Sequence, residues 1–359
     1  MSDPEALTRP AAAARPAEAG AVAAGPPRPW LVADIGGTNA RFGWLAEGAD
    51  RISHVATLPA AGHPGPADAA TSYLAGVAQA LGGAYRPPRA AAFAVATAVG
   101  TDRIAFTNSG WAFSCREAQA ALGLEALLVL NDFEALALSL PRLQAQQLLP
   151  WPGAPVRTAL PGRNALAVIG PGTGLGVAGL VPAPGGGWVA VPGEGGHASL
   201  SAADEFDAAL LAAVRREHPH VSAERLLSGI GLPVLHAAVA AVMGQGQDQP
   251  AATLAAEQIV ERGLNGSCAV CSRTLDAFCA LLGSFAGNVA LVMGARGGVY
   301  IGGGIVPRLG ERFFQSPFRQ RFEAKGRFQA YLQAIPTLLI TDTLAALNGG
   351  VQALTQHRA

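Results

Sequence analysis

Two copies of one design, far apart in the chain, constrain the fold more than any other feature. In the first, the apolar run 30–33 leads into the segment 34–41 (DIGGTNAR), which carries an acid, two adjacent glycines and a threonine. In the second, the apolar run 165–169 leads into the segment 170–176 (GPGTGLG), and a further apolar run follows. Glycine turns let backbone amides approach an anion. The repetition predicts two related lobes with one polyphosphate between them, hence a nucleotide in an interdomain cleft.

The first turn has residue types suited to a phosphate and its cation. We expect Gly36 and Gly37 to adopt positive φ angles and to bring their N–H groups toward the anion. Thr38 adds a hydroxyl, and Asp34 can hold a cation through water. Taken alone, the turn could equally be an ordinary hairpin.

Two other phosphate-binding motifs do not match. A P-loop requires a lysine after its second glycine, and the only lysine of the chain is Lys325. A dinucleotide fingerprint is formally present at 174–179, with Glu194 near the expected acidic position. That fingerprint must open a helix, and the prolines and glycines of 182–187 leave no room for one.

Length and composition predict a globular protein with two domains. The chain has 359 residues, half of them apolar, and a formal net charge of zero, which gives no reason to expect nucleic acid or membrane partners. The apolar stretch 277–294 contains small and polar residues, so we interpret it as a buried helix. Residues 1–28 are rich in Ala and Pro and lack a secretory signal, and we expect a disordered tail, or an upstream segment that is not translated.

The cysteines favour a reducing cytoplasm. Cys268 and Cys271 form one Cys-x-x-Cys, but a structural zinc needs four ligands and the sequence has no second pair. Cys271, Leu275 and Cys279 recur at helical spacing, which favours small buried residues on one helix face. We therefore predict free thiols and a cytoplasmic protein.

Apolar runs and helical patterns alternate in an α/β order. Ser114, followed by an acid three residues later, predicts a helix that begins at about 115 and ends at about 122. The other predicted strands are 55–59, 90–98, 126–130, 299–301 and 337–341, and the other predicted helices are 67–81, 135–140 and 343–356.

Polar side chains follow the predicted strand 126–130. Asn131 and Asp132 stand at its carboxyl end, where open α/β sheets bind ligands, so both are candidate site residues. The alternative is that Asp132 only caps the following helix.

Three later segments are candidate ligand loops. The glycine-rich stretch 191–197 carries Glu194 and His197 within reach of each other. Ser222 is expected to cap a helix with Glu224 in its first turn, where the helix dipole alone would explain the acid. The glycines 302–304 could support a flat nucleobase, or could form a tight loop without a ligand.

Eight motifs in order give the chain its resemblance to a known family. They are Asp34 to Arg41, Thr107-Asn108, Trp111, Asn131 to Phe133, Gly172 to Gly176, Pro192 to His197, Ser222 to Gly229 and Gly302 to Pro307. With these motifs the chain resembles bacterial glucokinases from about Trp30 onward. The zinc-binding cysteine cluster of the related repressor, open-reading-frame and kinase (ROK) group is absent, which favours the bacterial glucokinase branch.

The resemblance implies an α/β fold of the two-domain actin-like, RNase H-like (hexokinase-type) ATPase class, with an interdomain cleft. Residues 29–142 plus 339–359 would form a small α/β domain, and residues 143–338 a large α+β domain. A homodimer is also what the family suggests.

The resemblance further implies phosphorylation of the 6-hydroxyl of D-glucose by ATP and Mg²⁺. Asp132 would be the general base, and the other sugar hydroxyls would be bound by Asn131, Glu194, His197 and Glu224. Asp34 would hold the metal through water. The nucleotide would be bound by Ala33, Asp34, Ile35, Gly36, Gly37, Thr38, Gly172, Thr173, Gly174, Gly302 and Gly303.

Two alternatives remain open at the level of the sequence. The chain could phosphorylate another hexose, because hydroxyl-binding residues change preference with small changes in the wall of a site. It could also be a sugar-responsive regulator without turnover. The presence of Asp132, and the lack of a helix-turn-helix pattern before Trp30, argue against the regulator.

Overall fold

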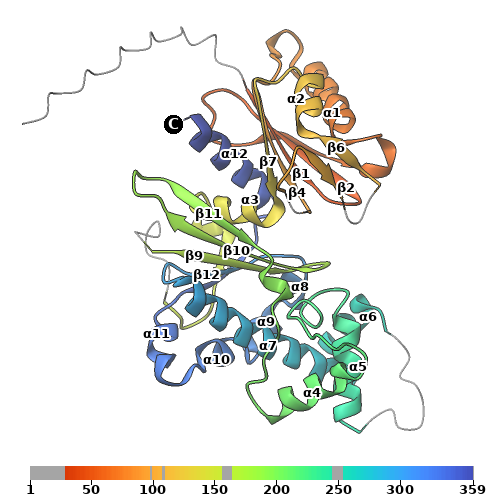
Figure 1. Cartoon of the computed structure of the whole chain (residues 1–359), viewed down its shortest axis with the longest axis vertical. Coiled ribbons are helices and arrows are strands. Elements are labelled where there is room, and N and C mark those ends of the chain that lie inside the picture. The colour runs from red at the N-terminus through yellow and green to blue at the C-terminus, as the bar shows by residue number, and fades with distance from the viewer. Residues whose placement is uncertain (1–28, 98, 107–109, 156–163, 245–253, 359) are drawn as a thin grey trace, which may run out of the picture.

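The computed structural model describes residues 29–97, 99–106, 110–155, 164–244 and 254–358. The predicted tail 1–28 and the motif residues 107–109 lie outside these ranges. Two β-sheets follow each other along the long axis of the molecule, with helices α3 (Asp132–Ser139) and α12 (Ala345–Arg358) between them (Figure 1).

The first sheet has the strand order β3-β2-β1-β4-β7. Its strands are β1 (Trp30–Ile35), β2 (Asn39–Leu45), β3 (Ser53–Pro59), β4 (Ala90–Val95) and β7 (Ala126–Asn131). Strands β1, β4 and β7 run parallel, while β2 and β3 are antiparallel neighbours on the other side of β1. Every residue of β4 is buried, as expected for an apolar strand that is covered on both faces. A separate two-stranded sheet pairs β5 (Arg103–Ala105) with β6 (Ala112–Ser114).

The second sheet repeats this arrangement with the order β11-β10-β9-β12-β13-β8. Its strands are β8 (Leu148–Pro150), β9 (Leu166–Pro171), β10 (Leu175–Pro182), β11 (Trp188–Gly193), β12 (Val299–Ile301) and β13 (Thr337–Ile340). Strands β9, β10 and β11 form an antiparallel series, and β12 and β13 run parallel to β9. Each sheet therefore places a glycine hairpin beside parallel strands, which confirms the predicted α/β fold with two related lobes.

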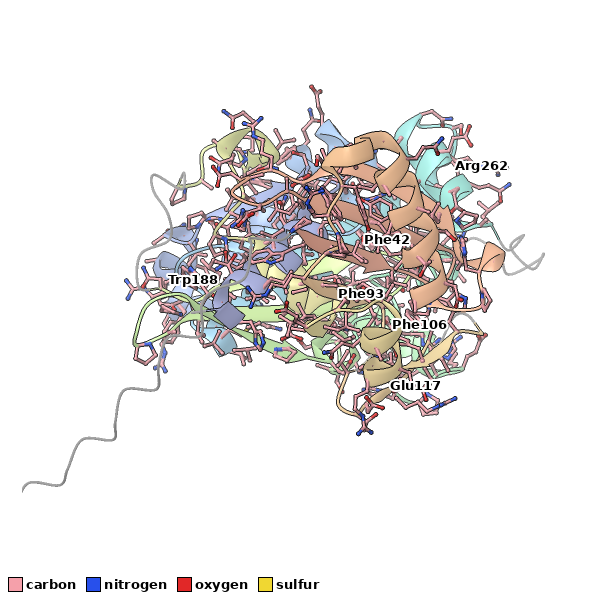
Figure 2. The ribbon with its side chains drawn as sticks, turned by 90° about the horizontal axis from the view of Figure 1, so that it is seen from above. Phe42, Phe93, Phe106, Glu117, Trp188 and Arg262 are labelled. Carbon is pink, nitrogen blue, oxygen red and sulfur yellow. The ribbon has the colours of Figure 1, made fainter. Side chains whose placement is uncertain are left out.

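Helices cover both faces of the first sheet. On one face lie α1 (Pro66–Leu81) and α2 (Cys115–Ala121), whose apolar side chains pack with Phe42 and Phe93 (Figure 2). The ring of Tyr73 in α1 stacks on Phe42 with centroids 5.2 Å apart. On the other face, Leu347 and Val351 of α12 pack against the strands, so the C-terminal helix completes this lobe.

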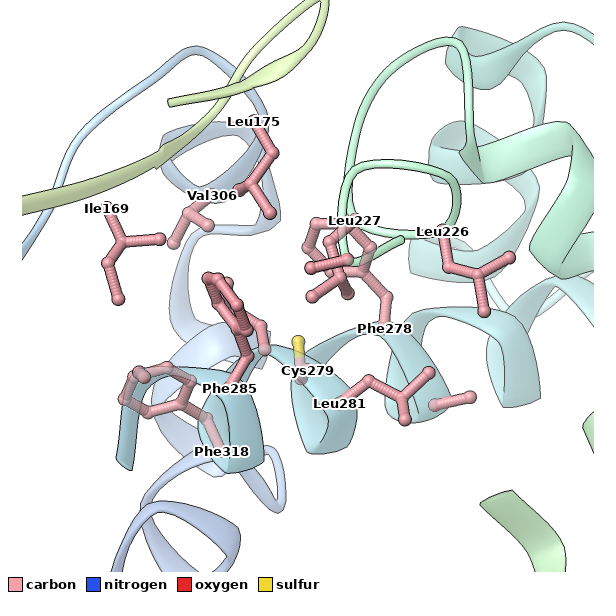
Figure 3. Close-up of a cluster of buried hydrophobic side chains, with 14 of the residues drawn as sticks. Ile169, Leu175, Leu226, Leu227, Phe278, Cys279, Leu281, Phe285, Val306 and Phe318 are labelled. Carbon is pink, nitrogen blue, oxygen red and sulfur yellow. The ribbon is translucent and has the colours of Figure 1, made fainter. Parts of the chain in front are cut away.

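The core of the second lobe forms around α7 (Ala269–Met293). Phe278, Leu281 and Phe285 of α7 are buried with Ile169 and Phe318 from other elements (Figure 3). The most apolar 18-residue window of α7 could cross a membrane by length and composition, but 72% of it is buried inside the molecule. The apolar stretch 277–294 is therefore a core helix, as predicted.

Shorter helices complete the second lobe. They are α4 (Glu205–Arg215), α5 (Leu232–Val242), α6 (Ala256–Leu264), α8 (Ile305–Leu309), α9 (Glu311–Gln315), α10 (Phe318–Glu323) and α11 (Gln329–Gln333). The division into 29–142 plus 339–359 and 143–338 stays a prediction. Strand β13, which spans the second of these boundaries, is hydrogen-bonded within the second sheet.

One predicted helix is wrong. Ser222 accepts a hydrogen bond from the backbone N–H of Arg225 at 3.2 Å, as a helix cap would, but no helix follows. The chain turns instead, and Gly229 N donates to Gly172 O of the second hairpin at 2.8 Å. A Cβ on Gly231 would lie 2.5 Å from Arg225 O, so this close turn excludes larger residues.

Candidate active site

The first sheet brings the candidate acids to one edge. Ile35 of β1 pairs with Val95 of β4, and Val95 pairs with Asn131 of β7, so the three strands end side by side. Asn131 Oδ1 accepts hydrogen bonds from the backbone N–H of Phe133 (2.9 Å) and Glu134 (3.3 Å) and thereby caps α3. The residue that caps this helix is therefore Asn131 and not Asp132.

Asn131 is largely occupied by local structure. Besides capping α3, it donates a hydrogen bond from Nδ2 to the carbonyl oxygen of Thr97 at 3.2 Å. An amide NH₂ group has two hydrogens, so one can still bind a ligand while the side chain is held in place.

Asp132, the first residue of α3, has a perturbed carboxylate. Burial raises its pKa, a hydrogen bond from the N–H of Phe133 opposes the shift, and the negative charges of Asp34 and Glu194 add to it, so that the resulting pKa is about 6. Coulomb interactions of this kind fall with distance, so Asp34 and Glu194 lie close enough to act on the carboxylate of Asp132 although the three come from separate segments.

Asp34 lies partly buried at the end of β1. Burial raises the pKa of its carboxyl, and the positive charge of Arg41, which faces it across the β1–β2 hairpin, lowers it.

The backbone of the first glycine turn differs from the prediction, because neither Gly36 nor Gly37 has a positive φ angle. The turn is closed by a hydrogen bond from Gly36 N to Asn39 O at 2.9 Å, and this closure does not need a left-handed residue. Thr38 is exposed beside it.

The second hairpin makes close contact with α3. A Cβ on Gly170 or Gly176 would collide with the ring of Phe133, so these glycines allow the ring to lie against the hairpin. Phe133 directly follows Asp132. The second lobe therefore helps to place the candidate base, a requirement that the sequence did not reveal.

Glu194, His197 and Glu224 meet as expected. His197 Nε2 lies 3.8 Å from Glu194 Oε2, and His197 Nδ1 lies 3.8 Å from Glu224 Oε1. These separations are too long for direct hydrogen bonds, so the three side chains can still bind hydroxyl groups. His197 and Glu194 are exposed, with 60% and 72% of their side chains accessible, whereas Glu224 is 24% accessible.

Glu224 is held by the second hairpin. Its Oε2 accepts a hydrogen bond from Leu175 N at 2.8 Å, and a Cβ on Gly174 would collide with the same oxygen. The helix-dipole explanation of Glu224 is thus wrong, because no helix forms there and the carboxylate binds a distant backbone amide instead.

A cavity of about 510 Å³ lies beside the second hairpin. Its lining residues are Gly172, Thr173, Gly229, Leu232, Ala256, Glu257, Val260, Glu261, Gly304, Ile305 and Arg308. The predicted residues Gly302 and Gly303 are not among them. Gly303 has a φ of 76°, and a Cβ there would collide with Pro171 O, so it serves close packing of two strand ends.

Most residues of this lining were not among the predicted site residues. Glu257 and Glu261 lie on α6, and Arg308 lies on α8, whereas Gly229 follows Glu224 in its loop. No local motif marks the charged residues, because their meeting with Thr173 depends on helix packing. Gly229 ends the motif Ser222 to Gly229, and Gly304 and Ile305 belong to the motif Gly302 to Pro307.

Comparisons with known proteins agree with this architecture. The family model described as Glucokinase matches residues 31–357. A glucokinase of Paramagnetospirillum magneticum is 48% identical over 319 residues, which cover 89% of this chain and 95% of the relative. A glucokinase of Chromobacterium violaceum is 48% identical over 337 residues, covering 93% of this chain and 92% of the relative.

A solved structure gives the same result. The crystal structure of a glucokinase from an Antarctic psychrotroph aligns with a TM-score of 0.82 and 38% identity, covering 92% of this chain and 99% of that one. The residues that match the family model include every described candidate residue and all but the first residue of the two sheets. The chain therefore belongs to the glucokinase family.

Proposed function

We propose that this site transfers the γ-phosphoryl group of ATP to the 6-hydroxyl of D-glucose, with Asp132 as the general base. As a glucokinase, the chain is an enzyme that phosphorylates glucose with ATP. The observation that supports the role of Asp132 is its carboxylate, which has a pKa of about 6 and shares a site with Asp34 and Glu194. A base with a pKa near the working pH is deprotonated and still able to accept a proton.

The residue types suit phosphoryl transfer, which depends mainly on positioning and on neutralisation of charge. Asp132 would orient the 6-hydroxyl and take its proton as the new bond to phosphorus forms. Glu194, His197 and Glu224 would bind other hydroxyls, with Asn131 contributing its remaining N–H. A hydroxyl missing from such a site leaves polar groups unpaired, at a cost of about 1–3 kcal/mol each.

The acidic groups fit a Mg²⁺ that arrives with ATP. Carboxylate oxygens and water are the ligands that Mg²⁺ prefers, and Asp34 is a partly buried carboxylate whose pKa is raised by burial. Asp34 would hold the metal through water. When bound, Mg²⁺ neutralises charge on the phosphate oxygens.

The two hairpins and the cavity would hold the nucleotide. The backbone of residues 33–38 and of 172–174 would bind the phosphates, and the strand end at Gly302 and Gly303 would support the same ligand. The cavity beside Thr173 has a volume in the range of small-molecule sites and would accept the adenosine part.

The direct test measures ADP release from Mg-ATP and glucose by wild type and by Asp132→Asn. The substitution nearly preserves shape and removes the proton acceptor, so we expect kcat to fall by about 10²-fold or more. Asp68→Asn, on the exposed side of α1, is the matched control and should keep full activity. A fully active Asp132→Asn enzyme would show that Asp132 is not the base.

A panel of hexoses tests the sugar. We expect kcat/KM to be highest for D-glucose, since its hydroxyls would satisfy all the paired groups. A higher kcat/KM for mannose or an N-acetylated hexose would show that this sugar, and not glucose, is the preferred substrate. Glucose binding without ADP release would indicate a regulator without turnover.

The assembly and the location of the protein belong to the same proposal. We infer a homodimer from the family resemblance and a cytoplasmic location from the free thiols. Light scattering would check the first, since a particle of one chain mass (36.4 kDa) excludes a dimer.

A further inference from the structure

Three metal-binding side chains from separate segments meet in the second lobe. They are His236 of α5, Cys268 at the N-cap of α7, and Cys271 in the first turn of α7. Their possible ligand atoms all lie within 4.8 Å of one another. His236 and Cys271 are buried, Cys268 is partly buried, and all of the cysteines are free thiols.

One distance in the cluster equals the ligand separation of a tetrahedral zinc site, and the others lie within 4.8 Å. Zinc lies about 2.3 Å from sulfur and about 2.0–2.1 Å from imidazole nitrogen, so two such ligands in a tetrahedron are about 3.6 Å apart. Cys271 Sγ and His236 Nε2 are 3.6 Å apart. A hydrogen bond between thiol and imidazole would also explain this pair, but it would not explain the third ligand, Cys268.

Helix capping explains only part of the placement of Cys268. Its Sγ accepts from the N–H of Cys271 at 3.4 Å, yet serine, threonine, aspartate and asparagine are the residues that cap helices well. A cysteine at this position, turned toward a second cysteine and a histidine, is explained by a soft metal ion.

We propose that His236, Cys268 and Cys271 bind one Zn²⁺, with a fourth coordination position open to water on the partly exposed side of Cys268. This site is separate from the residues proposed for phosphoryl transfer. It differs in ligand type from the oxygen ligands expected for Mg²⁺.

The surroundings allow a divalent cation. The Nε2 atom of His236, one of the possible ligand atoms, faces the sulfur of Cys271. The guanidinium of Arg262 is the positive charge that acts on both cysteines. Two thiolates balance Zn²⁺, so the occupied site adds no net charge beside Arg262.

The metal would join the helices that form one wall of the cavity. Leu232 at the start of α5 and Val260 of α6 line the cavity, and α6 directly precedes the Cys268 loop. Zinc would link α5 to the start of α7 and should raise the melting temperature of the enzyme, because it binds only the folded arrangement.

The test titrates reduced, metal-free, full-length protein with Co²⁺ and then with Zn²⁺. We expect one equivalent of Co²⁺ with intense tetrahedral d–d bands and thiolate charge-transfer bands, which Zn²⁺ displaces. Cys268→Ser should weaken binding by at least about 100-fold, since even outer-shell changes cost 10–100-fold. Serine is a good cap, so this variant should keep its metal-free melting temperature. Cys115→Ser, at the start of α2 and outside the cluster, is the matched control and should bind normally.

Two results would overturn the proposal. One is a wild-type Co²⁺ spectrum without thiolate charge-transfer bands. The other is equal Zn²⁺ affinity in wild type and Cys268→Ser, or in wild type and His236→Asn. Each of these readouts is independent of glucose phosphorylation.

Discussion

Asp132 owes its raised pKa to its surroundings. Partial burial removes water from the carboxylate, and the charges of Asp34 and Glu194 further disfavour its ionised form. The N–H of Phe133 offsets only part of this effect. The result is an aspartate whose pKa, about 6, is some two units above that of an exposed aspartate.

The pH dependence of turnover should show this pKa. Because the base must be deprotonated, kcat/KM for glucose should fall about tenfold per pH unit below about pH 6. Glu194→Gln removes a nearby negative charge, so it should move this limb to lower pH whatever it does to sugar affinity. A wild-type profile that stays flat down to pH 5 would contradict the assignment.

The buried carboxyl of Asp132 should also lower the free energy of unfolding of the protein. A carboxyl whose pKa is higher in the folded than in the unfolded protein binds more protons when folded, so stability falls as pH rises from about 4 to about 6. Asp132→Asn removes this cost and keeps the oxygen that accepts from Phe133 N. We expect a free energy of unfolding higher by on the order of 2 kcal/mol at pH 7.5.

Urea denaturation of both proteins at two pH values checks this expectation. The advantage of Asp132→Asn should shrink at pH 5, where the wild-type carboxyl is mostly protonated in the folded state. If Asp132→Asn is less stable than wild type at pH 7.5, burial does not disfavour the ionised form of the Asp132 carboxyl.

At the level of elements, α3 and the second hairpin depend on each other. The ring of Phe133, in the first turn of α3, lies against Gly170 and Gly176, which flank the turn between β9 and β10. The same hairpin holds Glu224 through Leu175 N. This hairpin therefore positions both the proposed general base, Asp132, and a residue proposed to bind the sugar, Glu224.

Gly176→Ala tests this dependence. The added methyl group would collide with Phe133, so the ring and the start of α3 must move, and Asp132 with them. A displacement of about 1 Å at a catalytic group can cost about 10²-fold in rate, and we expect a loss of that order in kcat.

A second substitution separates this effect from general damage to the fold. Phe133→Leu shortens the side chain, so the double variant Gly176→Ala, Phe133→Leu should be more active than Gly176→Ala alone. Gly76→Ala in α1, where a Cβ has open space, is the neutral control. Full activity of Gly176→Ala would refute the coupling.

For the molecule as a whole, two lobes meet through α3 and α12. A Cβ on Gly349 of α12 would collide with Ala135 O of α3, so the two helices are in close contact. Arg41 of the first hairpin donates from Nη1 to Thr343 O at 2.5 Å, on the segment that leads from the second sheet into α12. Asp34 belongs to the first sheet and Glu224 is held by the second hairpin, so the distance between these two carboxylates depends on the angle between the lobes.

We expect the lobes to close when glucose binds, because the residues proposed for the site belong to both lobes, with Asp34 in the first sheet and Leu175, which holds Glu224, in the second. Closure would also exclude water that could otherwise accept the phosphoryl group. The radius of gyration from X-ray scattering should decrease with glucose and stay unchanged with L-glucose. Equal radii with and without D-glucose would contradict closure.

Short-range patterns in the sequence predicted most strands of the two sheets, the helices α1, α2, α3, α7 and α12, and the α/β class of the fold. Apolar runs and glycine turns predicted both hairpins, and the polar residues after the strand 126–130 predicted Asp132, because strand ends in an α/β sheet are places where ligands bind. The correct elements depend on residues close in sequence, whose conformation and burial pattern are local properties.

Tertiary structure alone decided which neighbours these residues have. It assigned the cap of α3 to Asn131, replaced the helix expected around Glu224 with a loop bound to Leu175 N, and required Gly176 for the ring of Phe133. It also brought His236 to a cysteine 35 residues away. Such contacts join segments that are distant in the chain, and their partners are chosen by packing, which no local sequence pattern records.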